Sequence, residues 1–388
     1  MERRDFLKYA GFMSASSAIP LLTPEILFAA NHKQTNKIVV LVELKGGNDG
    51  FNTLVPFKDE LYYKYRPRIA IKERQVLKLN KEVGLHPRMK ALMPLWDRGQ
   101  MAWVQGVGYP NPVLSHFRSM DIWDSASNSN QFIEDGWLSR ILPNYKKGLH
   151  GIALNKGQAE LGPLTSSHLN SVTMQDPRTF LSQIKRIDDV KPSRRTAAIA
   201  HISQTQHQLF DVGEQLNTKM GRRMKRAGVR FSKGVLGHSL ESVAEMIING
   251  VDAPVYKVTQ DGFDTHAGQR GAQDNGLYQL SNGLASFQKS MQRAGLWNNV
   301  LVVTYSEFGR RAKENRAGGT DHGTASSHMI LGGKVHGGIY GRHPNLARLD
   351  ANGNVQHTTD FRSIYASLAQ RWWRQASPWK GHKTIPFV

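Results

Sequence analysis

The run from Lys37 to Leu44 constrains the fold more than any other part of the sequence. It reads KIVVLVEL, and its apolar, largely β-branched residues do not alternate with polar ones. Such a run is typical of a β-strand that is buried on both faces, as in a parallel sheet covered by helices. A glycine-rich loop, Lys45–Gly50, follows at once. Because ligands bind at the carboxyl ends of strands in open α/β sheets, this loop is a candidate for part of a binding site.

Further apolar runs predict more strands, and helical patterns alternate with them. The strands are expected at 101–107, 255–259, 299–305 and 329–331, and the helices at about 113–123, 194–216, 239–249, 276–295 and 360–373. Residues 145–190 predict only irregular structure or short strands. The alternation indicates an α/β fold with a mostly parallel central sheet flanked by helices. The sequence has no internal repeat and no clear linker, so residues 31–388 are expected to form a single domain.

The amino terminus has the pattern of an export signal. Arg3 and Arg4 are followed by Phe-Leu-Lys and by a weakly apolar stretch, which resembles a twin-arginine signal. Serines and prolines interrupt the apolar stretch, so we expect no stable transmembrane span. Residues 1–30 are therefore expected to be a signal segment, with the twin-arginine export machinery as a partner and a periplasmic or secreted location. An ordinary amphipathic helix is the alternative.

The charge balance concerns partners rather than fold. Lys and Arg number 51 and Asp and Glu 31, which gives a formal net charge of +20. This balance favours an anionic substrate, either a small molecule or a polysaccharide, although a solvated basic surface would look the same. Nucleic acid is a further alternative, which the export signal argues against. The chain has no cysteine, and this excludes disulfides, thiolate metal sites and cysteine nucleophiles.

Carboxylates and imidazoles gather just after the predicted strands. They are Asp49, Asp264, His266, Glu307, Asp321, His322 and His328. Because the carboxyl ends of parallel strands share one edge of a sheet, we expect these side chains to converge. Carboxylate oxygens and neutral imidazoles bind divalent cations, and one or two such ions (zinc, manganese or calcium) would suit a hydrolytic site. Taken singly, each residue could equally be a helix cap, a turn residue or a surface residue.

Ser115 is the candidate nucleophile. It stands at the predicted start of a helix, where backbone N–H groups and the helix dipole stabilise an anion. A metal ion could lower the pKa of its hydroxyl group. A plain N-cap serine is the alternative. His116 could supply a ligand or an acid, and Arg118 could bind an anionic oxygen in a bidentate manner.

Several ordered segments resemble a known family. They are GGNDG, SHFRSMDIW, GFDTH, TYSEFGRR, GGTDHG and DFRSIYASL, and they extend from the first predicted strand almost to the carboxyl end. Together they resemble a bacterial family catalogued as domain of unknown function 1501. That family is similar in turn to the alkaline phosphatase and sulfatase superfamily, which implies an alkaline-phosphatase-like α/β fold.

The superfamily resemblance implies roles for individual residues. Asp49 corresponds to an aspartate after the first strand that binds one metal ion. Ser115 falls at the position of the nucleophilic Ser or Thr. Asp321 and His322 look like an adjacent Asp-His metal pair.

The resemblance also implies a second metal site. Asp264 and His266 look like its ligands, His328 is the expected final ligand with His336 as a rival, and Glu307 is a further ligand or a supporting carboxylate. The spacing of Asp264 and His266 is shorter than is usual in the superfamily, and the context of the serine differs from that of sulfatases. The number of metal ions and the catalytic activity are therefore open at this stage.

The sequence as a whole predicts an exported metal-dependent hydrolase of phosphate or sulfate esters with a serine nucleophile. The alternative is a non-catalytic envelope protein of the same fold that binds anionic polysaccharide or a protein partner.

Overall fold

Strand β1 (Ile38–Leu44) lies in the middle of the main sheet, as its apolar run predicts. The computed structural model describes residues 37–142, 148–156, 159–186, 197–221 and 224–388, so the expected signal segment at 1–30 lies outside the described residues. Residues 36–388 cluster into one compact unit.

The main sheet has nine strands. They are β1, β5 (Met101–Gly108), β6 (Gly151–Leu154), β7 (Ser171–Met174), β8 (Val255–Gln260), β9 (Val300–Tyr305), β12 (Ser326–Gly332), β13 (Gly338–Tyr340) and β14 (Thr359–Asp360). Their order is β13-β5-β12-β9-β1-β8-β6-β7, with β14 also paired to β5. Only β12 among these strands is antiparallel to its neighbours. The expectation of a mostly parallel sheet is therefore confirmed.

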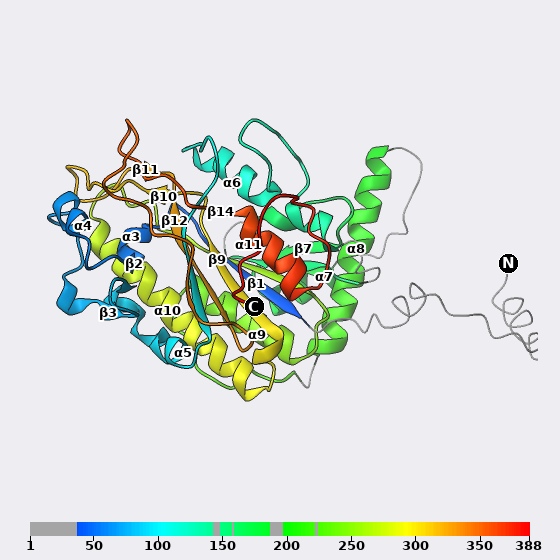
Figure 1. The fold of residues 1–388 in the computed structure, drawn as a ribbon. Coiled ribbons are helices and arrows are strands. Elements are labelled where there is room, and N and C mark those ends of the chain that lie inside the picture. The colour runs from blue at the N-terminus through cyan, green and yellow to red at the C-terminus, as the bar shows by residue number, and fades with distance from the viewer. Residues whose placement is uncertain (1–36, 143–147, 157–158, 187–196, 222–223) are drawn as a thin grey trace, which may run out of the picture. The chain divides into compact units, whose positions relative to one another are not determined.

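The helices surround this sheet (Figure 1). They are α3 (Gly50–Thr53), α4 (Glu60–Tyr65), α5 (Met93–Asp97), α6 (His116–Ser125), α7 (Pro177–Ile184), α8 (Ala197–Met220), α9 (Val235–Ile248), α10 (Gln269–Arg293) and α11 (Arg362–Ser367). Shorter helical turns are η1 (Glu73–Gln75), η2 (Pro87–Leu92), η3 (Trp137–Arg140), η5 (Gly162–Leu164), η6 (Trp297–Asn299) and η7 (Leu368–Trp372). Two small sheets are formed by β2 (Leu54–Val55), β4 (Gly84–Leu85) and β3 (Leu77–Lys78), and by β10 (Gly309–Arg310) and β11 (His322–Gly323).

Each face of the sheet has its own core, because successive side chains of a strand point to opposite faces. Val40 and Val42 of β1 pack with buried residues of α9 and α10. Val39 and Leu41 pack with buried residues of α6, η3, α11 and η7, among them several tryptophans. Burial on both faces explains why β1 carries an unbroken apolar run rather than an alternating one.

The predicted strands and helices are found, with shifted ends. The predicted helix at 276–295 begins earlier, at Gln269, and the one at 239–249 begins at Val235. The region expected to be irregular contains β6, β7 and α7, whose strands have four residues each. None of the helices in the described part of the chain is long and apolar enough to cross a membrane.

The packing of α9 on the sheet gives a test of the fold. Leu240 on α9 is fully buried, whereas Val235 on the same helix is 38% exposed. Replacing Leu240 by Ala should lower the free energy of unfolding by roughly 2–5 kcal/mol, because it leaves a cavity in the core. Val235→Ala, the matched control, should change it by no more than about 0.5 kcal/mol. Urea denaturation measures both, and equal losses would contradict this packing.

Candidate metal centre

The candidate site lies at the edge of the sheet where β1, β5, β8 and β9 have their carboxyl ends. The loop 45–49 follows β1, the loop 261–268 follows β8, and residues 306–308 follow β9. Because β12 is antiparallel to β9, the residues just before β12 reach this same edge. Segments that are distant in sequence therefore meet here.

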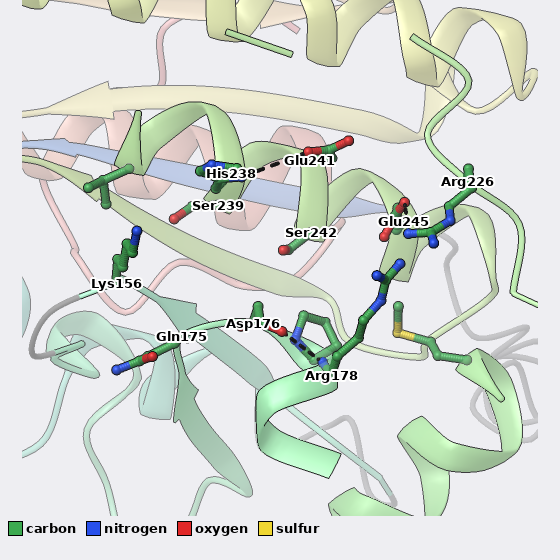
Figure 2. A pocket seen from close by; sticks show the side chains of 13 residues that line it. Lys156, Gln175, Asp176, Arg178, Arg226, His238, Ser239, Glu241, Ser242 and Glu245 are labelled. Carbon is green, nitrogen blue, oxygen red and sulfur yellow. Dashed lines mark hydrogen bonds and ion pairs between the residues drawn. The ribbon is translucent and has the colours of Figure 1, made fainter. Parts of the chain in front are cut away.

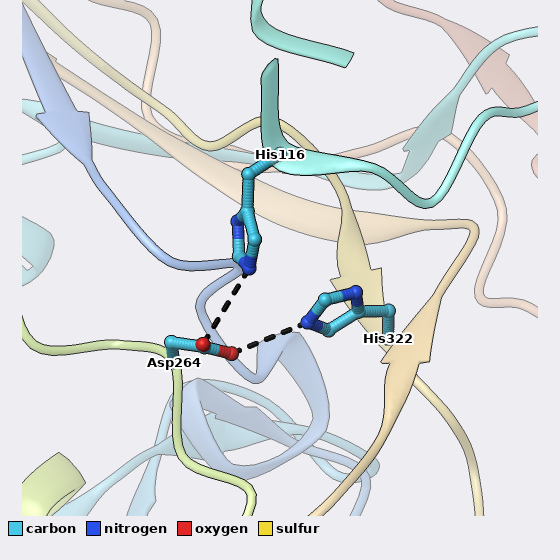
Figure 3. A group of neighbouring side chains, drawn as sticks. All are labelled: His116, Asp264 and His322. Carbon is cyan, nitrogen blue, oxygen red and sulfur yellow. Dashed lines mark hydrogen bonds and ion pairs between the residues drawn. The ribbon is translucent and has the colours of Figure 1, made fainter. Parts of the chain in front are cut away.

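Three side chains converge on one point at this edge (Figure 3). His116 begins α6, Asp264 lies in the loop after β8, and His322 begins β11. The Nε2 atom of His116 is 3.5 Å from Oδ2 of Asp264. The Nε2 atom of His322 is 3.2 Å from Oδ1 of Asp264. One potential ligand atom from each residue lies within 4.8 Å of the others.

Hydrogen bonds at the far side of each imidazole fix its tautomer. Nδ1 of His116 is 2.8 Å from Oε1 of Glu307, and Nδ1 of His322 is 2.8 Å from the carbonyl oxygen of Leu114. A carboxylate and a carbonyl only accept hydrogen bonds, so Nδ1 carries the proton in both rings. Each Nε2 then keeps its lone pair when the ring is neutral, and both lone pairs are directed toward Asp264. This is the arrangement by which proteins orient histidines that bind metals.

The protonation states favour the same interpretation. Burial lowers the pKa of His322, so its ring is neutral at neutral pH. Burial alone would raise the pKa of Asp264, but the hydrogen bond and the positive charge of Arg310 outweigh it and lower the pKa, so this carboxylate is ionised.

The donor set therefore fits a divalent cation. Imidazole lone pairs and a carboxylate that face one another repel unless a proton or a cation lies between them. Two nitrogen ligands and one carboxylate oxygen are a common ligand set for catalytic zinc. All three side chains are partly exposed, at 34% for His116, 47% for Asp264 and 20% for His322, so that a substrate could reach them.

His266 and Asp321 lie beside these three residues. Nε2 of His266 is 2.9 Å from Nε2 of His322 and 3.1 Å from Oδ1 of Asp264. Its Nδ1 atom is 3.6 Å from Oδ1 of Asp321. A hydrogen bond from Asn315 leads the causes that lower the pKa of Asp321, and the nearby Arg311 adds to it. The predicted pairs Asp264–His266 and Asp321–His322 are thus brought together.

A buried scaffold holds these loops in place. The carboxylate of Glu307 accepts hydrogen bonds from the backbone N–H groups of Gly46 and Gly47, at 2.9 and 3.0 Å. Both glycines have positive φ, and a Cβ on Gly46 would lie 2.3 Å from the backbone nitrogen of Asp264. Only glycine fits there. Glu307, which is fully buried, therefore acts on the candidate centre through His116 and through this loop.

Arg310 joins the remaining loops. Its guanidinium donates to the backbone carbonyls of Gly46, Gly47, Phe263 and Thr320 and to Oδ1 of Asp264, the last at 2.6 Å. The side chain is completely buried. Arg310 was not singled out from the sequence, because a single arginine in a sequence does not show whether its guanidinium group is buried or exposed.

Ser115 stands in the sequence between two residues that take part in the site. It is the N-cap of α6, immediately before His116 and immediately after Leu114, whose carbonyl holds His322. Ser115 is exposed, and its hydroxyl makes no capping hydrogen bond to the helix. The hydroxyl group is therefore not used to cap α6.

Asp49 is at the expected edge but has other partners. It accepts hydrogen bonds from the first N–H groups of α3, and its Oδ2 is 2.5 Å from Nη1 of the buried Arg66. The side-chain amide of Gln269 also donates to Oδ2. The structure does not bring Asp49 into the group of His116, Asp264 and His322. Arg66 and Gln269 were not singled out from the sequence.

His328 and His336 also lie apart from the group. His328 is within β12, where it pairs with Val104 of β5, and its ring packs edge-on against Trp123 with centroids 5.2 Å apart. Neither ring nitrogen of His328 has a hydrogen-bond partner in the described part of the chain. His336 follows the other end of β12, at the opposite edge of the sheet, and faces the carbonyl of Pro386.

Arg118 holds a surface loop rather than the candidate centre. Its guanidinium donates to the carbonyls of Ser129 and Gln131 and lies 3.9 Å from the centroid of the Phe132 ring. His116, for which the sequence allowed the role of a ligand or an acid, is the residue of this helix that lies in the group with Asp264 and His322.

The chain belongs to the family described as protein of unknown function DUF1501, whose model matches residues 36–384. This confirms the family predicted from the ordered segments. No curated protein matches the sequence.

Solved structures with a similar fold include a periplasmic domain, a sulfatase and a protein in the alkaline phosphatase superfamily. The C-terminal periplasmic domain of EcEptC from Escherichia coli in complex with zinc is 11% identical, over 89% of this chain and 84% of that chain, with a TM-score of 0.41. PsFucS1 sulfatase from Pseudoalteromonas sp. is 11% identical, over 94% of this chain and 74% of that chain, with a TM-score of 0.37. A protein in the alkaline phosphatase superfamily from Vibrio parahaemolyticus is 9% identical, over 80% and 63%, with a TM-score of 0.37. At this low level of similarity, neither the roles of residues nor the activities of these proteins can be transferred to this chain.

The burial of His328 gives the protein a specific pH dependence. Burial lowers the pKa of His328 from 6.5 to about 3. Below about pH 6.5 the unfolded chain therefore takes up a proton that the folded chain does not, and stability is lost as the pH falls. This residue alone should lower the free energy of unfolding by about 2 kcal/mol between pH 6.5 and pH 5.

Urea denaturation at several pH values tests this expectation. His328→Phe keeps an aromatic ring against Trp123 but cannot titrate, so its stability should fall less steeply with acid than that of the wild type. The control is His168→Phe, at an exposed position, which should keep the wild-type slope. Equal slopes for all three proteins would contradict the assignment.

Proposed function

We propose that this protein is an exported, metal-dependent hydrolase of phosphate or sulfate esters in which Ser115 is the nucleophile. The observation that carries the proposal is the convergence of two oriented imidazole nitrogens and one carboxylate, with Ser115, an exposed serine that makes no capping hydrogen bond, directly before His116 in the chain. The Arg3-Arg4 pattern supports export by the twin-arginine route to the periplasm or beyond.

Three residues would hold one divalent ion, with zinc favoured by the nitrogen ligands. They are His116, Asp264 and His322. Three protein ligands leave a coordination position open, as in catalytic rather than structural sites. When bound, such an ion stabilises negative charge on the transferred group and lowers the pKa of a nearby hydroxyl.

The remaining steps are performed by side chains of the chain. The hydroxyl of Ser115 loses its proton to solvent, its oxygen attacks phosphorus or sulfur, and the bond to the ester oxygen breaks with its electron pair on the leaving alcohol. His266, oriented by Asp321, is placed to give that oxygen a proton. The N-terminal N–H groups of α6 stabilise the anionic oxygens of the group on Ser115. Water then hydrolyses the ester on Ser115 and restores the hydroxyl.

Metal content tests the first half of the proposal. Protein purified after native export should contain about one equivalent of a divalent metal, measured by inorganic mass spectrometry. Asp264→Asn should lose most of this metal, because it removes the charge of one ligand while an amide oxygen can still face Arg310. Asp261→Asn, in the same loop but exposed and outside the group, is the control and should keep its metal. Absence of metal from the wild type, even after reconstitution, would exclude the mechanism.

The role of Ser115 is tested by turnover. A chromogenic aryl phosphate and an aryl sulfate are the substrates, and at least one should be hydrolysed by the metal-loaded enzyme. Ser115→Ala should reduce kcat by about a thousandfold or more with unchanged metal content, because it removes the nucleophile. Ser167→Ala, at an exposed position elsewhere, should leave kcat unchanged. A metal-loaded wild type with no turnover would favour the alternative of a non-catalytic envelope protein.

A further inference from the structure

A groove lies between α10 and the segment formed by η2 and α5, at the edge of the sheet opposite the candidate centre. Gln100 lines it and directly precedes β5, and Arg293 lines it and ends α10, shortly before β9 begins. The groove is therefore at the amino ends of β5 and β9, whereas the candidate centre is at their carboxyl ends (Figure 1). Its volume of about 700 Å³ is typical of ligand-binding pockets. We call it the α5–α10 groove.

Both walls of the groove have the spacing of a helix face. The α10 wall consists of Ala285, Gln288, Lys289, Gln292 and Arg293. Residues at such intervals share one face of a helix, and that face is apolar where a helix packs against a core. Here the face carries amides and cations instead. The opposite wall consists of Ala91, Pro94, Leu95 and Arg98.

Every charged side chain that lines the groove is a cation. These side chains are Arg98, Lys289 and Arg293, and none of them forms an ion pair with a residue in the described part of the chain. Arg98 and Arg293 have neutral partners instead, because Nε of Arg98 is 3.5 Å from Oε1 of Gln100 and Nη1 of Arg293 donates to the carbonyl of Gly228. These partners orient the guanidinium groups without neutralising them. Like charges on the two walls repel, and an anion bound between them relieves that repulsion.

The pocket shown in Figure 2, beside α9, differs in this respect. Three carboxylates and three cations line it together, namely Asp176, Glu241, Glu245, Lys156, Arg178 and Arg226. Opposite charges side by side largely cancel each other's field. In the α5–α10 groove the charges have one sign, and a cleft of one sign attracts ligands of the opposite charge.

The uncharged lining of the groove favours a sugar over a nucleobase as the ligand. Gln100, Gln288 and Gln292 contribute amide groups, which both donate and accept hydrogen bonds, as a sugar hydroxyl does. The buried Leu95 and Ala285 add a small apolar surface. Among the described residues, no aromatic side chain lines the groove, so it has no ring on which the bases of a single-stranded nucleic acid could stack.

We propose that the α5–α10 groove binds a segment of an acidic polysaccharide. Arg98, Lys289 and Arg293 bind its anionic groups through charge-assisted hydrogen bonds, and the glutamine amides bind its hydroxyls. Because the groove and the candidate centre lie at opposite edges of the sheet, the bound segment is not the group that reacts at the centre. The groove instead holds the protein on an anionic polymer, and this role does not depend on the hydrolysis proposed above.

Binding of a fluorescently labelled dextran sulfate oligosaccharide, measured by fluorescence anisotropy, tests this proposal. All proteins carry Ser115→Ala, so that the candidate nucleophile cannot consume the probe. Adding Arg98→Gln and Lys289→Gln should weaken binding at least about tenfold, because two charge-assisted contacts are lost. The matched control is Lys72→Gln with Arg74→Gln, which removes the same charge from two exposed residues outside the groove. It should change the affinity no more than about twofold, since distant exposed charges are screened by salt.

Three further measurements complete the test. Lys289→Arg keeps the charge and should bind within about twofold of the Ser115→Ala protein. Lys289→Gln alone, at an exposed position, should weaken binding and decides the matter if thermal melting shows that the double variant is unfolded. Uncharged dextran should not bind at the same concentrations.

Two outcomes would overturn the proposal. Equal weakening by the groove pair and the control pair would mean that the probe binds the basic surface as a whole. Tighter binding of a single-stranded DNA of equal charge than of the oligosaccharide would mean that the groove is not built for a polysaccharide.

Discussion

The candidate centre depends on the buried guanidinium of Arg310. Four carbonyls and the carboxylate of Asp264 accept its hydrogen bonds, and they belong to the loops after β1 and β8 and to the segment before β11. A buried charge is stable only when it is paired and its donors are satisfied. Arg310 meets this condition only if all three loops are in place, so the geometry of the site and the burial of one cation require each other.

The site is layered from buried supports to exposed ligands. Glu307 and Arg310 are inaccessible to solvent, whereas Asp264 and His116 are 47% and 34% exposed. Buried hydrogen bonds therefore set the orientation of side chains whose reactive atoms face the solvent. A metal centre needs its ligands to be oriented by buried residues in this way, because the ligands are then held in place without blocking a substrate. The chain's excess of basic residues agrees with an anionic substrate.

The sequence predicted the central strands because their apolar runs are long and β-branched. It also predicted that Asp264, His266, Asp321 and His322 would lie together at one edge of the sheet, where the structure has them. It could not predict β6 and β7, since four residues are too few to show a period. It could not show that Arg66 forms an ion pair with the carboxylate of Asp49, because the two residues are 17 positions apart in the sequence. His328 stood near the Asp-His pair in sequence, but the direction of β12 carries it into the sheet. Such outcomes depend on tertiary packing, which local patterns do not record.

The place of β1 has a consequence for how the chain is made. Both neighbours of β1 come late: Val39 pairs with Val255, and Val40 with Val302. During synthesis both edges of this apolar strand therefore stay unpaired until more than two hundred further residues have emerged from the ribosome. Proteins whose strands pair over such long sequence distances fold slowly, and they expose aggregation-prone hydrophobic surface while they fold. A nascent chain of this kind is a natural client for chaperones, and any truncation before β9 would leave its most aggregation-prone segment without a partner.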